Sequence, residues 1–78
     1  MKSNDFEKLK GRIRNEKSTF DVSEAGRGIG LSPTVFYSAI RKPSFDKLTT
    51  GEFLFLEEIV RILDNRKKRM NNLAKSAR

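Results

Sequence analysis

Four side chains suited to nucleic-acid contact recur on one side of a short predicted helix. When residues 33–41 are placed at about 100° per residue, the outer face holds Thr34, Tyr37, Ser38 and Arg41. Thr and Ser hydroxyls bond base edges or phosphates, Tyr stacks on a thymine methyl or bonds a phosphate, and Arg binds guanine or phosphate. The pattern predicts a face for the major groove of DNA, with Arg41, near the helix end, on a phosphate.

The chain lacks the residues that most enzyme and metal sites require. It contains no Cys and no His, so only a carboxylate site remains open. Most acids lie at helix starts or beside basic residues, where capping and surface pairing account for them. The segment 26–30, Gly-Arg-Gly-Ile-Gly, lacks the strand and the full pattern of a phosphate-binding loop. We expect no enzyme activity, no metal, no cofactor and no small-molecule ligand.

Cap patterns and apolar spacing predict the two helices that precede this face. A cap at Asn4 starts a helix over residues 5–16, whose solvated surface carries Lys8, Lys10, Arg12 and Arg14. A cap at Asp21 starts a short helix that ends by Gly28, with an inner side made of Val22, Ala25, Gly26 and Ile29.

A glycine turn leads into the third helix. Ser32-Pro33 favours a helix start, because Ser is a good N-cap and Pro is tolerated at the first helical position. Pro43 ends this helix, and its inner side holds Val35, Phe36, Ala39 and Ile40. Gly30 suits the left-handed conformation of a tight turn, and Gly26 allows the second and third helices to approach closely.

The last predicted helix runs from about 51 to 64. Thr49 and Glu52 cap it, after a loop in which Phe45 or Leu48 packs against the core. Its apolar residues cover about half of the helical wheel. One interpretation is that the helix lies at the centre of the fold and buries the whole apolar face in the core of one copy. The other, which we expect, is that part of the face forms a homodimer interface. No segment alternates with period two, so the fold is all-α.

The excess of positive charge lies at the end of the chain. Of a net charge of +7, residues 65–78 supply +6 with no acid, and residues 1–64 supply +1. We expect a domain over 1–64 and a flexible or frayed-helical tail over 65–78 that is a DNA-backbone arm, a membrane-surface patch or a solubilising end. Residues 1–5 lack the apolar core of a secretion signal, and no apolar run crosses a bilayer, so a cytoplasmic location, without membrane association, is expected.

The segment from Phe20 to Ile40 resembles the phage Cro and repressor-type, or lambda-repressor-like, helix-turn-helix family, and the similarity extends more loosely over residues 5–63. The residues that carry the resemblance are Gly26, Gly30, Leu31, Ser32, Phe36 and Ile40, with Phe20 before the first motif helix. The resemblance implies a compact bundle of four or five helices, often dimeric on a palindromic operator. It places the DNA contacts at Ser32, Pro33, Thr34, Tyr37, Ser38 and Arg41. The family often has Gln where this chain has Val22, so that contact is not carried over.

Three further polar residues complete the candidate site. Lys17 and Thr19, before the second helix, are backbone contacts or ordinary loop residues, and Lys42 follows the third helix. We expect a sequence-specific transcription regulator of double-stranded DNA, of phage or prophage type, in a bacterial host cytoplasm or nucleoid. The alternative is a protein-interaction module, such as an antirepressor or accessory factor. RNA binding is less favoured, because the sequence offers no platform of exposed aromatics.

Overall fold

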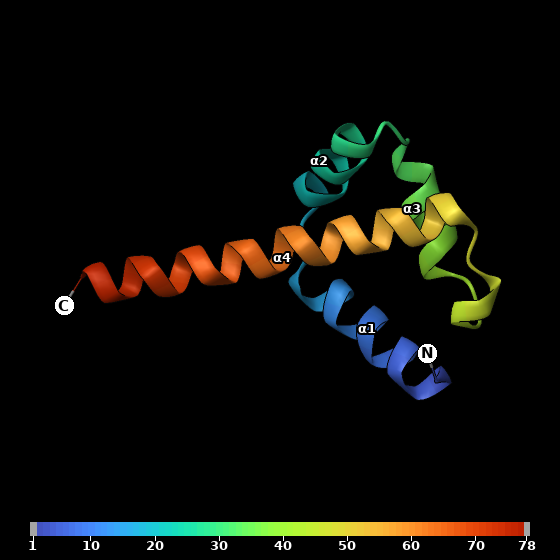
Figure 1. Ribbon diagram of the computed structural model, residues 1–78, viewed down its shortest axis with the longest axis horizontal. Coiled ribbons are helices and arrows are strands. Elements are labelled where there is room, and N and C mark those ends of the chain that lie inside the picture. Colours follow the sequence, from blue (N-terminus) through green and yellow to red (C-terminus); the bar gives the residue numbers. More distant parts are fainter. Residues whose placement is uncertain (1, 78) are drawn as a thin grey trace.

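The computed structural model describes residues 2–77, which form helices and their connections (Figure 1). In chain order the elements are α1 (Ser3–Glu16), α2 (Thr19–Ile29), α3 (Pro33–Ile40), the 3-10 turn η1 (Phe45–Lys47) and α4 (Thr50–Ser76). No strand occurs in this part of the chain. The all-α prediction is confirmed.

The long helix α4 is the centre of the fold, and the other helices pack around its first half (Figure 1). Phe36 of α3 lies against Phe55 of α4, with ring centroids 5.9 Å apart. Phe45 and Leu48 pack at the edge of the core, as predicted. Within residues 2–77, ten apolar side chains are buried: Phe6, Ile13, Val22, Ala25, Phe36, Ala39, Phe55, Leu56, Ile59 and Leu63. The predicted inner faces are therefore confirmed, and most of the broad apolar face of α4 serves one copy's core.

Two predicted helix starts are wrong. Helix α1 begins at Ser3, and its N-cap, Lys2, makes no side-chain capping bond, so Asn4 lies inside the helix. Helix α2 begins at Thr19, because Ser18 is its cap: the Ser18 hydroxyl accepts from the Asp21 N–H at 3.2 Å, and the Asp21 carboxylate accepts from the Ser18 N–H at 2.9 Å. Asp21 is thus the third residue of the helix rather than its cap.

The predicted solvated surface of α1 is only partly exposed. Lys8 and Arg14 are exposed, but Lys10 is buried: its ammonium donates to the Lys42 carbonyl at 3.0 Å and pairs with Glu7 at 2.9 Å. Arg12 is half-buried and pairs across the fold with Asp64 at 2.5 Å. Long-range partners, which local spacing does not reveal, draw these two side chains inward.

Helix α4 is longer and more regular than predicted. Thr49 and Glu52 form the predicted capping box. The helix then continues without a break to Ser76, so the segment expected to be a flexible or frayed-helical tail is helical as far as that residue. Its distal half extends beyond the other helices (Figure 1). Of the helices in residues 2–77, none has the length and apolar character needed to cross a bilayer.

Candidate nucleic-acid interface

The connection between α2 and α3 is a tight turn made by glycine. Gly30 adopts a left-handed conformation with φ of 73°, as predicted, and the Leu31 N–H donates to the Gly26 carbonyl at 2.9 Å. A Cβ atom on Gly26 would lie 2.5 Å from the Leu31 carbonyl oxygen and 3.3 Å from the Phe55 ring. Gly26 therefore makes room for the turn itself and for α4, rather than for α3 as predicted.

The outer face of α3 carries three of the four side chains predicted to contact DNA. Thr34, Tyr37 and Arg41 are exposed, and Tyr37 keeps 43% of its surface accessible while its ring meets the Phe36 ring edge-on. Ser32 and Pro33, at the start of the helix, are exposed as well. Ser32 occupies the N-cap position without a side-chain capping bond, so its hydroxyl remains available.

Ser38 does not lie on that exposed face. Its side chain is half-buried, and its hydroxyl donates to the Glu52 carboxylate at 2.5 Å. The helical wheel placed Ser38 outside because it ignores neighbouring helices, and the first turn of α4 lies beside this position. Ser38 therefore joins α3 to α4 rather than facing outward.

Lys42 is also engaged within the fold. Its ammonium lies 3.3 Å from the Glu52 carboxylate and donates to the Lys47 carbonyl at 3.4 Å. Burial of Glu52, which is 3% exposed, raises its pKa, but hydrogen bonds from Ser38, Thr49 and Lys42 outweigh burial and lower the pKa to about 2. A charged Glu52 thus holds Lys42 in place, and the predicted DNA contact of Lys42 competes with this ion pair.

The two contacts predicted before α2 lie in different settings. Thr19 is the first residue of α2 and is exposed. Lys17 is half-buried, and its ammonium lies 5.7 Å from the centroid of the Phe36 ring, on the helix that carries the candidate face. Thr19 is therefore accessible to a phosphate, whereas Lys17 is partly used to cover α3.

A partly buried ion pair that sequence reasoning missed joins α1, α2 and α4. Arg66 donates to both oxygens of Asp21, at 2.9 and 2.7 Å, and to the Glu16 carbonyl at 2.6 Å. Asp21 is 3% exposed; burial raises its pKa, and hydrogen bonds from Ser18 and Arg66 outweigh burial and lower it. Arg66 therefore belongs to the folded part of the chain rather than to a separate tail. The partners are 45 residues apart, so no local pattern indicates them.

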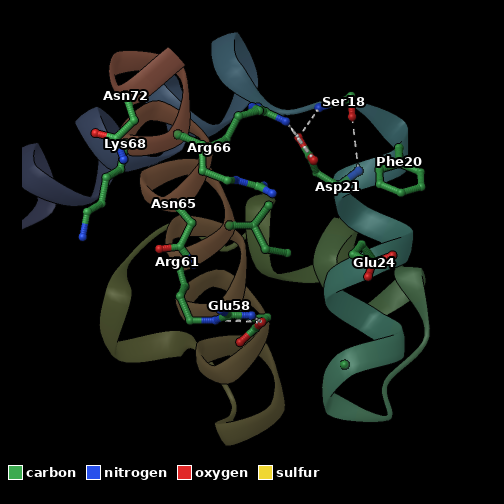
Figure 2. Close-up of a pocket in the computed structure, with 13 residues that line it drawn as sticks. Ser18, Phe20, Asp21, Glu24, Glu58, Arg61, Asn65, Arg66, Lys68 and Asn72 are labelled. Carbon is green, nitrogen blue, oxygen red and sulfur yellow. Dashed lines mark hydrogen bonds and ion pairs between the residues drawn. The ribbon is translucent and has the colours of Figure 1, made fainter. Parts of the chain in front are cut away.

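The Asp21–Arg66 pair lies in an open groove of about 920 Å³ between α2 and α4 (Figure 2). Phe20, predicted to precede the first motif helix, lies inside α2 and borders this groove with 68% of its surface exposed. Both acidic and basic side chains line the groove, among them Glu24, Glu58, Arg61, Lys68 and Arg69. Among the described residues, no group of three acidic side chains is placed to hold a metal ion.

The outer face of α3 is therefore an exposed polar surface that the fold supports on both sides, by the glycine turn before the helix and by Glu52 after it. The chain matches no protein-family model, no curated protein and no solved structure.

Proposed function

We propose that this chain is a sequence-specific regulator of transcription that binds duplex DNA through α3, as a helix-turn-helix protein of the Cro and repressor type. One observation carries the proposal: α3 presents Thr34, Tyr37 and Arg41 outward while its inner side is buried against the core. No acidic residue occurs between Gly30 and Phe45. A short, rigid helix with an exposed polar face and no acid suits the major groove.

Each exposed side chain has a distinct role in this proposal. Thr34, in the first turn, reaches base edges, since the N-terminal residues of a recognition helix contact bases. Tyr37 contacts a thymine methyl or a phosphate, and Arg41, at the end of α3, neutralises a phosphate. Thr19, at the start of α2, bonds the DNA backbone. Ser38 and Lys42 support α3 through Glu52 instead of reading bases.

Selection of bound sequences from a random pool of duplex DNA tests this function. The wild-type chain should enrich one sequence motif over successive rounds. A protein without base readout would enrich none while still binding at low salt through phosphate contacts. Absence of a motif under conditions where the chain binds DNA would therefore exclude sequence-specific regulation.

A homodimer completes the proposal. Two copies related by a two-fold axis would place their α3 helices about 34 Å apart, one turn of DNA, and would bind a palindromic site. Some apolar side chains near the start of α4 are not covered by the rest of the fold, because Phe53 and Leu54 are exposed. Phe53 also borders a groove of about 250 Å³ with Leu9, Leu48 and Val60. We propose that a second copy covers this surface.

Analytical sedimentation tests the predicted homodimer by measuring the oligomeric state. At micromolar concentration the chain should sediment as a dimer, alone or on the selected duplex, and the selected motif should be symmetric with half-sites one turn apart. A chain that stays monomeric both with and without the duplex would contradict the dimer while leaving DNA binding by α3 open to its own test.

A further inference from the structure

The distal half of α4 is a strongly basic helix without acidic residues. Between Arg66 and Ser76 the sequence contains five basic residues and no acid. Arg66 is neutralised by Asp21, whereas the other four are exposed and form no ion pair in the described part of the chain. We call these four side chains the distal basic cluster: Lys67, Lys68, Arg69 and Lys75.

The distal basic cluster spreads over about 200° of the helix circumference, which is wider than one face. At about 100° per residue, Lys67 and Arg69 project about 200° apart, and Lys68 and Lys75 lie between them on the outer side. Positive charge on opposite sides of one helix matches the two rows of phosphates that border a DNA major groove, which is about 12 Å wide and admits a helix. The arrangement suits a polyanion that approaches from more than one side.

The fold holds this helix in a fixed direction. It is continuous with the buried part of α4, and the bonds from Arg66 to Asp21 and to the Glu16 carbonyl fix it where it leaves the other helices (Figure 2). A helix that is ordered before binding loses less conformational entropy on binding than a flexible tail does. The distal basic cluster is thus pre-organised for a ligand.

This helix and α3 lie towards opposite ends of the molecule (Figure 1). The long dimension of the fold is 46 Å, and most of that length is α4 itself. The distal basic cluster therefore does not extend the face of α3. It forms a surface separate from the outer face of α3, and two of its members, Lys68 and Arg69, border the groove between α2 and α4.

We propose that the distal half of α4 is a second, sequence-independent binding site for duplex DNA, which contacts phosphates through Lys67, Lys68, Arg69 and Lys75. The proposal goes beyond the function of α3, because it gives one chain two DNA surfaces that face different segments. Apart from alanines, the apolar side chains in this half are Met70 and Leu73, too few for the broad apolar face that insertion into a membrane surface requires. Base readout plays no part in this site.

A matched pair of full-length variants tests the proposal. The distal variant carries Lys67→Gln, Lys68→Gln, Arg69→Gln and Lys75→Gln. The control variant makes the same change of charge at exposed sites elsewhere: Lys2→Gln, Lys8→Gln, Arg14→Gln and Lys47→Gln. Gln retains high helix propensity, so both variants should keep the helix content of the wild type, which circular dichroism verifies.

The measurement is the binding of a mixed-sequence duplex at several salt concentrations. Each phosphate contact contributes about 0.9 to the slope of log K against log salt, so the distal variant should lose about 3 to 4 from the slope. The control variant should stay close to the wild type. Tyr37→Ala combined with Arg41→Ala should lose no more than about 1, because only one charge is removed.

Equal losses of slope in the distal and control variants would overturn the proposal, because net charge alone would then account for binding. An unchanged slope in the distal variant would overturn it as well. The proposal would also be overturned if the distal variant lost binding to vesicles that contain phosphatidylserine but still bound the duplex as the wild type does. The distal basic cluster would then bind a membrane surface instead of DNA. Failure of the α3 proposal would appear elsewhere, as the absence of a selected motif.

Discussion

Gly26 and Glu52 fix α3 from its two ends. Gly26 leaves space for the Leu31 carbonyl in the turn that leads into α3, and Glu52 binds Ser38 and Lys42 where the helix ends. Neither residue lies on the exposed face, but both set its position. A recognition surface depends on such supports, because small displacements of a helix change which groups reach the base edges.

Gly26→Ala should destabilise the fold by about 1 to 3 kcal/mol, since its Cβ would lie 2.5 Å from a backbone oxygen that has little freedom to move. Gly28→Ala in the same helix is the matched control. Its Cβ would meet only the Glu58 carboxylate at 3.9 Å, so the loss of glycine's freedom in the unfolded chain should stabilise the protein by about 0.4 to 1 kcal/mol. Urea unfolding measures the stability of both variants. Similar unfolding midpoints for Gly26→Ala and Gly28→Ala would contradict the close packing described at Gly26.

Glu52 should make stability depend on acid pH. Its pKa is about 2 in the fold, against 4.5 for an unperturbed glutamate, so its contribution is fully present above pH 4.5 and is lost as the pH falls towards 2. The difference between the two values is equivalent to about 3 kcal/mol. Glu52→Gln should therefore flatten the pH dependence of the free energy of unfolding between pH 2 and 4.5. If the free energy of unfolding depended equally steeply on pH in the wild type and in Glu52→Gln, this role would be excluded. Glu57→Gln, at an exposed position, is the control and should keep the pH dependence of the wild type.

At the scale of elements, α4 has two structurally different parts. Its first half is the central helix of the core, and its second half leaves the fold at the point where Arg66 meets Asp21 (Figure 2). The ion pair ties the start of α2 and the end of α1 to α4. The orientation of α2, and through the glycine turn that of α3, therefore depends on a residue that lies in the basic end of the sequence.

Arg66→Gln should cost about 1 to 3 kcal/mol in the free energy of unfolding, because it leaves the buried Asp21 charge without its cation. The Arg66 side chain is itself about one third exposed, which keeps the cost below that of a fully buried pair. Arg69→Gln, one turn along the helix, removes the same charge from an exposed position and should change stability by less than about 0.5 kcal/mol. Equal denaturation midpoints for the two variants would contradict a structural role for Arg66.

Local patterns predicted much of this architecture, and long-range pairing accounts for what they missed. Apolar spacing placed the inner faces of α2 and α3 and most of that of α4, and Gly30 marked the turn. The helical wheel of α3 predicted the wrong side only for Ser38, because the Ser38 hydroxyl bonds Glu52 of another helix, α4. The sequence contains two overlapping cap patterns near α2, at Ser18 and at Asp21, and the distant Arg66 stabilises Asp21 as an interior residue. Such contacts cannot be inferred from spacing within one segment.

At the scale of the whole molecule, polarity and charge are divided between two ends. The candidate face on α3 has one exposed cation, Arg41, and the distal half of α4 carries four. This division predicts a division of labour in which α3 supplies sequence preference and α4 supplies salt-sensitive affinity. The distal basic cluster should then dominate binding to arbitrary DNA, and α3 should dominate the preference for one motif.

The most direct test of the central claim is a titration of the selected duplex, and of a scrambled duplex, with the wild type and with Tyr37→Ala and Arg41→Ala. Each substitution removes an exposed side chain of α3 and should leave helix content intact. If α3 contacts DNA, Tyr37→Ala should weaken binding to the selected duplex by about 1 to 3 kcal/mol, with a smaller effect on the scrambled one. Arg41→Ala removes a phosphate contact and should weaken binding to both duplexes by similar amounts. Unchanged affinity of both folded variants for the selected duplex would contradict recognition by α3.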